Sequence, residues 1–194
     1  PENCTHIGGA LTLSLLADTP ELAERLLQRG ATPDPQKLGG ENAMEEITSF
    51  QQVGGVMMLL RHGLDLNWED DFGYTHLHNA LAMQQYRIAE LLIEKGANPW
   101  RIGTGGSLPV QSFARPLILD RPLENEARLR LMAKAEAEAG SKGFTWPPPV
   151  VKTVRKMVLT GKWPTKEMLA AGVPPVSPIV MAHMRERFSK ELEQ

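Results

Sequence analysis

The stretch LIEKGANPW, residues 92–100, decides the fold because two earlier segments repeat its pattern. They are LLQRGATPD at 26–34 and LLRHGLDLN at 59–67. Their glycines, Gly30, Gly63 and Gly96, follow one another at intervals of 33 residues, and two large aliphatic residues precede each glycine in the same register. A fixed period of 20–50 residues is the signature of a repeat array. The sequence therefore predicts a stack of similar units.

Each unit predicts a pair of helices. Ahead of Gly96, Ile88, Ala89, Leu92 and Ile93 recur with the spacing of one helical face. The glycine stands where a helix ends in the left-handed conformation that glycine adopts freely. Shorter helices are expected before these, at about 9–17, 42–50 and 76–84, with polar turns between units at 31–40, 64–74 and 97–106.

The third copy resembles a known family. Asp70, Gly73, Thr75, Leu77, His78 and Ala80 match the pattern D-x-x-G-x-T-P-L-H-x-A of the ankyrin repeat, with His76 in place of the proline. The chain is similar to a divergent, bacterial ankyrin-repeat protein. The resemblance implies an all-α solenoid of about four to five helix-turn-helix repeats with a C-terminal capping helix.

The resemblance also predicts how the chain is divided. Residues 1–140 are expected to form the repeats, at about 4–34, 37–67, 70–100 and 103–140, and residues 141–194 a degenerate repeat and helical cap. The fourth repeat is expected to close at Gly140, with about 11 residues inserted around LILDRP at 117–122. A final helix at 178–193 is expected to cover the exposed apolar face of the last repeat.

Composition excludes several classes of protein. Hydrophobic residues make up 42% and charged residues 23% of the 194 residues, as in an ordinary globular protein, and no apolar run is long enough to cross a membrane. Cys4 is the single cysteine, which excludes a disulfide framework. Residue 1 is proline, so we expect a trimmed N-terminus; a cytoplasmic location is slightly favoured, with a periplasmic or secreted one left open.

Charge is distributed unevenly along the chain. Residues 1–100 hold 6 Lys/Arg and 14 Asp/Glu, whereas residues 101–194 hold 15 and 9. The basic C-terminal side chains, with tryptophans nearby, raise the alternative of nucleic-acid binding; they include Lys152, Arg155, Lys156, Lys162 and Lys166, near Trp146 and Trp163. The excess is small for phosphate binding, so nucleic acid is not the expected partner.

Two motifs suggest chemistry but have simpler interpretations. His76 and His78 lie two residues apart, which places them on different sides of a helix, and no further ligands are placed to complete a metal site. The glycine-rich RIGTGGS at 101–107 lacks the lysine and the preceding strand of a phosphate-binding loop, which favours a turn. We expect no catalytic residues, no metal and no cofactor, and therefore no enzyme.

The resemblance implies that the turn tips and the exposed inner-helix face form a concave groove that binds other proteins. Side chains expected there are Phe50, Trp68, Glu69, Asp70, Asp71, Phe72, Tyr74, Met83, Trp100, Arg101 and Ile102. Large rings on turns either bind a partner or pack on the neighbouring repeat, and both readings remain open. The acidic run 69–71 is expected to meet a basic patch on the partner.

The function expected from this surface is non-enzymatic binding of a dedicated protein partner. By analogy with small bacterial ankyrin-like proteins, this chain is expected to act as an immunity or inhibitory partner of a toxin or enzyme. The alternatives are a secreted effector that engages a host protein, or an enzyme or nucleic-acid binder whose site lies in 120–194.

Overall fold

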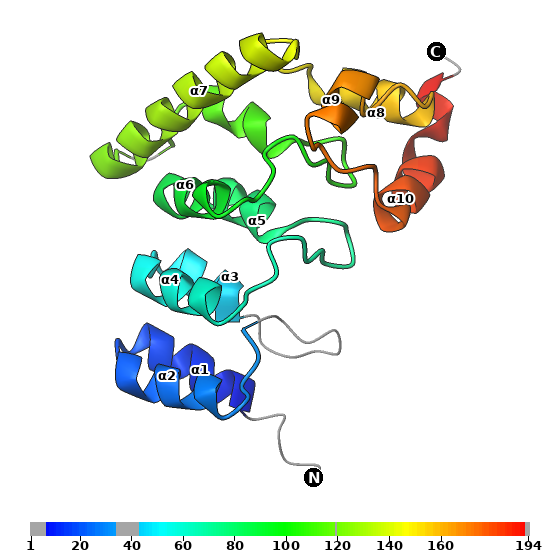
Figure 1. Cartoon of the computed structure of the whole chain (residues 1–194). Coiled ribbons are helices and arrows are strands. Elements are labelled where there is room, and N and C mark those ends of the chain that lie inside the picture. Colours follow the sequence, from blue (N-terminus) through cyan, green and yellow to red (C-terminus); the bar gives the residue numbers. More distant parts are fainter. Residues whose placement is uncertain (1–6, 34–42, 119, 193–194) are drawn as a thin grey trace. The chain divides into compact units, whose positions relative to one another are not determined.

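The computed structural model describes residues 7–33, 43–118 and 120–192, and these residues contain helices and no strand. They form two compact units, residues 1–68 and 69–194, hereafter unit 1 and unit 2, each described by itself. Cys4, the start of the first expected repeat and most of the expected turn at 31–40 lie outside the described residues. The all-helical architecture predicted from the sequence is confirmed (Figure 1).

Unit 1 holds two helix pairs and unit 2 a third. The pairs are α1 (Ile7–Leu16) with α2 (Pro20–Gln28), α3 (Ala43–Ser49) with α4 (Val53–Arg61), and α5 (His76–Ala82) with α6 (Tyr86–Glu94). Within each pair the helices pack on each other, and α1 also packs on α3. Apolar residues fill the interior of each unit, among them Leu11, Ile47 and Leu59 in unit 1 and Leu77, Ile88 and Leu92 in unit 2.

The 33-residue period reappears in the backbone at both ends of the second helix of each pair. Gly30, Gly63 and Gly96 have φ of 93°, 88° and 110°, as predicted for helix-closing glycines. After each one, a backbone N–H donates to the carbonyl five residues earlier, at 2.9–3.0 Å, which satisfies the end of the helix. The turn inside each pair repeats this bond and places Asp18, Gln51 or Gln84 at positive φ.

The fourth repeat departs from the predicted plan. Its first helix is a short 3₁₀ helix, η2 (Pro109–Ala114), and its second is the 21-residue α7 (Pro122–Lys142). The prediction that Gly140 closes this repeat is wrong, because α7 continues through it and ends at Gly143, whose φ is 70°. Alanine, leucine, glutamate, lysine and arginine dominate α7, and their helix propensity outweighs the cost of one interior glycine, about 1 kcal/mol. Most of the inserted length is therefore helix.

The C-terminal region of unit 2 consists of α8 (Val151–Leu159), α9 (Lys166–Ala170), α10 (Pro178–Phe188) and the 3₁₀ helix η3 (Ser189–Leu192). The predicted terminal helix forms and packs on α8, where it buries Val180 and Met184. It also reaches back to the turn that precedes α5, a contact that the sequence did not predict. Figure 1 shows α10 beside that turn.

Candidate protein-binding surface

The turn at residues 70–74, hereafter the tip, is built around Asp70. Oδ1 of Asp70 accepts hydrogen bonds from the backbone N–H of Phe72 at 2.9 Å and of Tyr74 at 2.8 Å. The Asp70 N–H donates to the Tyr74 carbonyl at 3.0 Å, and Gly73 turns back with φ of 71°. The Asp70 carboxylate therefore holds the shape of the tip, which is what an aspartate in an Asx turn does.

Glu69 and Arg101 are paired with each other. Oε1 of Glu69 accepts from Nε of Arg101 at 3.0 Å and from its Nη2 at 2.8 Å, and both side chains are largely buried. This pair joins the residue before the tip to the turn at 101–107. Of the acidic run, Asp71 is the exposed residue, whereas Glu69 is engaged by Arg101 and Asp70 by the turn.

Phe72 is the exposed ring of the tip. Its side chain is 49% exposed, and its ring centroid lies 5.9 Å from that of His183 on α10. Nε2 of His183 lies 3.2 Å from the Asp71 carbonyl, and a Cβ placed on Gly73 would clash with Val180. Thus α10 packs on one side of the tip and leaves part of Phe72 accessible.

The expectation that Trp100 and Ile102 stand exposed is wrong. Trp100 is 2% exposed and Ile102 is 3% exposed. The Trp100 ring meets the ring of Phe144 edge to face, with centroids 5.0 Å apart. Phe144 follows the long α7 and is distant from Trp100 in the sequence. It covers Trp100, which the local sequence pattern places on a turn. Because they are buried, Trp100 and Ile102 cannot contact a partner in this conformation.

Tyr74 lines a hollow on the first-helix side of repeats three and four. Its ring lies 5.4 Å from the His78 ring, and a Cβ on Gly103 would overlap it. The hollow has a volume of about 280 Å³; its lining is Tyr74, His78, Asn79, Leu81, Ala82, Ser107, Leu108, Pro109, Ser112 and Arg115. Asn79 and Ser112 are half-buried and Arg115 is exposed, so polar groups surround the apolar floor. Tyr74 was expected from the sequence to belong to the binding surface, whereas Arg115 was not.

His78 fixes the start of α5. Its Nδ1 lies 3.2 Å from the Thr75 N–H, which donates to it, and 3.0 Å from the Thr75 hydroxyl. Burial lowers the pKa of His78 to about 4, helped by the charge of Arg101, while the carbonyls of Ser107 and Arg101 oppose this shift. The ring is therefore neutral at pH 7. His76, also buried, occupies the first position of α5.

The remaining predicted binding residues are divided between the units. Met83 is half-buried at the end of α5 in unit 2. Phe50, which is 62% exposed, and the half-buried Trp68 belong to unit 1. The structure thus brings together Asp71, Phe72 and Tyr74 on one tip.

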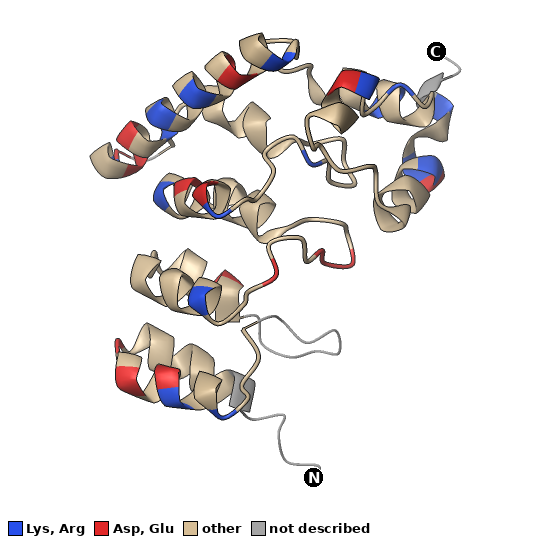
Figure 2. Cartoon of the chain, viewed as in Figure 1, with Lys and Arg blue, Asp and Glu red and all other residues tan. Residues whose placement is uncertain are grey.

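The turn at 101–107 contacts α8. Its Gly103 N–H donates to the Ser107 carbonyl at 3.0 Å, and Gly106 has φ of 81°. Arg155 on α8 packs on Gly106, donates to the Gly105 carbonyl at 3.3 Å, and lies 4.2 Å above the Phe188 ring. Figure 2 shows further Lys and Arg residues on α8, α9 and α10.

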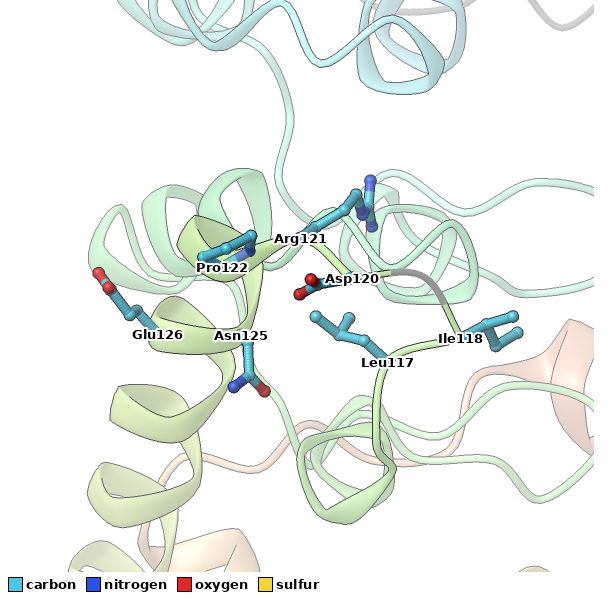
Figure 3. A pocket seen from close by; sticks show the side chains of 7 residues that line it. All are labelled: Leu117, Ile118, Asp120, Arg121, Pro122, Asn125 and Glu126. Carbon is cyan, nitrogen blue, oxygen red and sulfur yellow. The ribbon is translucent and has the colours of Figure 1, made fainter.

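A wide recess of about 510 Å³ lies at the beginning of α7 (Figure 3). Its lining is Leu117, Ile118, Asp120, Arg121, Pro122, Asn125 and Glu126. Arg121 is engaged elsewhere, since it donates to the carbonyl of Gln84. The lining contains no histidine, serine or cysteine, and its ionisable side chains are Asp120, Arg121 and Glu126. In the part of the chain that the structure describes, no three His, Cys, Asp or Glu side chains gather as a metal site, and no helix is suited to crossing a membrane.

Stacked helix pairs joined by turn tips define an all-helical repeat protein. Residues 11–102 match the family model for ankyrin repeats (3 copies), so this part of the chain is made of ankyrin repeats. It is similar to "Ankyrin repeat and SOCS box protein 6" of Homo sapiens, with 36% identity over 74 residues, which are 38% of this chain and 18% of that protein. The Pongo abelii protein of the same name matches equally well.

A bacterial relative matches over a longer segment. The "Putative ankyrin repeat-containing protein" of Treponema pallidum (strain Nichols) is 30% identical over 108 residues, which are 54% of this chain and 35% of the relative. The matches thus span about a fifth to a third of these relatives' own lengths. Ankyrin repeats are general protein-interaction modules, and their fold is not an enzymatic one.

Proposed function

We propose that this chain is a non-enzymatic module that binds a dedicated protein partner through its tip and the adjacent first-helix face of repeats three and four. The observation that carries the proposal is the hollow of about 280 Å³, where Tyr74 and Arg115 stand beside an apolar floor. Tyrosine and arginine are enriched among residues that dominate binding energy, and such anchors fill pockets from which water is excluded.

Tyr74 is suited to be the anchor because it is already held in place. His78 and Gly103 pack against its ring, while Asp70 fixes the backbone on which it stands. A side chain that is immobile before binding loses little conformational entropy when the partner arrives. Phe72, on the same tip, supplies exposed apolar surface that a partner would bury.

The charges of this surface narrow the partner's chemistry. With Glu69 held by Arg101 and Asp70 by the tip, the acidic side chain presented outward is Asp71. The basic patch expected on the partner is therefore narrowed to one positively charged group that faces Asp71. Arg115 at the hollow favours a carboxylate or carbonyl group on the partner, because its guanidinium can donate two parallel hydrogen bonds.

A dedicated partner is supported by the features that distinguish this chain from a regular array. The 3₁₀ helix η2, the long α7 and the contact of α10 with the tip give the binding surface a particular outline. We infer an occluding role, as the immunity or inhibitory partner of a toxin or enzyme. This step rests on analogy between proteins of similar fold.

Affinity purification from the native organism tests the proposal when unmodified chain is compared with two variants. Phe72→Ala and Leu129→Ala each remove a large apolar side chain, exposed by 49% and 43%, from the tip and from α7 respectively. A single stoichiometric partner should be retained by the unmodified chain and by Leu129→Ala, and weakened by Phe72→Ala. Equal retention by all three would overturn the assignment of the surface, and a host protein as sole partner would favour an effector.

A further inference from the structure

A third cavity, in the C-terminal half of unit 2, is walled by aromatic rings. Trp100 follows α6, Phe144 follows α7 and Trp163 follows α8, so three separate segments supply the rings, and all three are buried. Met157 and Met168 add thioether side chains. The cavity measures about 120 Å³; its remaining lining is Gly143, Thr145, Pro149, Thr165 and Glu167. This space suits a compact organic group and is too small for a peptide segment.

The rings are arranged as adjacent walls rather than as a stack. The planes of Trp100 and Phe144 make an angle of 77°, with centroids 5.0 Å apart. An aromatic face carries negative charge density and an aromatic edge positive charge density, so this edge-to-face contact pairs one edge with one face and leaves the remaining faces free of the other ring. Polarizable methionine sulfur extends this surface without adding positive charge. Walls of this kind attract a cation that has lost its water.

Glu167 is the ionisable side chain of the lining, and no lysine, arginine or histidine belongs to it. It lies exposed in the first turn of α9, two residues after the half-buried Thr165. Hydrogen bonds from its own backbone N–H and from the Thr165 hydroxyl lower the pKa of Glu167, so the carboxylate is charged at neutral pH. A single carboxylate without histidine or cysteine is a poor set of ligands for a metal ion.

We propose that this cavity binds a small organic cation with a methylated ammonium group. The aromatic walls would contact the methyl groups, and the carboxylate of Glu167 would balance the charge. The site is separate from the protein-binding surface of the tip and requires no partner protein. It contains no feature that would act on the ligand chemically, so its role is recognition.

The experiment uses the full chain with its four tryptophans replaced biosynthetically by 5-fluorotryptophan. Choline is titrated against 3,3-dimethylbutan-1-ol, which has the same shape but a neutral carbon in place of nitrogen, at constant ionic strength. The fluorine resonances of Trp100 and Trp163 should shift saturably with choline. Trp68 and Trp146 do not line the cavity, so the chemical shifts of their resonances should not change. Single Trp→Phe variants assign the four resonances.

Choline should bind about tenfold more tightly than the neutral alcohol, the size of effect that a desolvated cation–π contact provides. Glu167→Gln should weaken choline binding several-fold and leave the alcohol unaffected, while Glu136→Gln, exposed on α7, should change neither. Equal affinity for both molecules would reduce the cavity to an apolar void and overturn the proposal. The absence of a saturable shift with choline would also overturn the proposal. Neither of these two results depends on a variant that must fold.

Discussion

Lowering the pH should destabilise unit 2 through His78. The pKa of this residue is about 4 in the folded chain and 6.5 in its ordinary state, so the folded chain holds the neutral ring. As the pH falls below 6.5, His78 binds a proton in the unfolded chain but remains neutral in the folded chain. The stability contribution is therefore complete above pH 6.5, declines between 6.5 and 4, and is lost below 4. A difference of about 2.5 pKa units at 1.36 kcal/mol each approaches about 3 kcal/mol.

The matched variant is His78→Gln, because glutamine at the third position of a helix can still accept the hydrogen bond from the Thr75 N–H but does not titrate. Urea unfolding of both chains at pH 7.5, 6, 5 and 4.5 should show the unmodified chain losing about 2–3 kcal/mol more than His78→Gln, since all other groups cancel. An NMR titration of the His78 ring should have its midpoint near 4. Parallel pH curves for the two chains, or a midpoint above 6, would refute the reasoning.

Three further substitutions test packing and hydrogen bonding in unit 2 by urea unfolding. Leu92→Ala removes a fully buried side chain and should cost ~2–5 kcal/mol; a neutral result would mean that the helix register is wrong. Glu124→Ala removes the carboxylate that accepts a backbone N–H from the first turn of α6 at 3.0 Å and should cost ~1–3 kcal/mol, whereas the exposed Glu126→Ala should cost little. Asp70→Ala should destabilise the tip by ~1–2 kcal/mol, and Asp71→Ala should stay within ~0.5 kcal/mol; equal effects would contradict the role of Asp70 in the turn.

The repeat architecture could be predicted because its signals are local. Glycine closes each second helix through a hydrogen bond that spans five residues, so a 33-residue spacing of glycines reports directly on the backbone. The form of the fourth repeat was harder to predict. Nothing in the sequence near Gly140 shows that the surrounding helix formers outweigh it, and the first helix of that repeat is reduced to the 3₁₀ helix η2.

The positions of the side chains in the proposed binding surface could be predicted in part. Asp70, Phe72 and Tyr74 were placed on one tip by the family pattern, which is a local signal. The burial of Trp100 depends on Phe144, and the contact of α10 with the tip depends on Val180 and a glycine more than a hundred residues away. Contacts between such distant segments leave no local trace in one sequence. Arg115 was missed because it lies beyond η2, outside the tip positions that the family pattern identifies.

The central claim is that the tip and the first-helix face of repeats three and four contact a protein. Hydrogen–deuterium exchange of the chain, alone and saturated with the partner recovered by affinity purification, tests it most directly. We expect slowed exchange at residues 70–83 and 107–115, with exchange in the outer helix α7 unchanged. Protection confined to α7, or to α8 and α10 at residues 151–159 and 178–188, would contradict it.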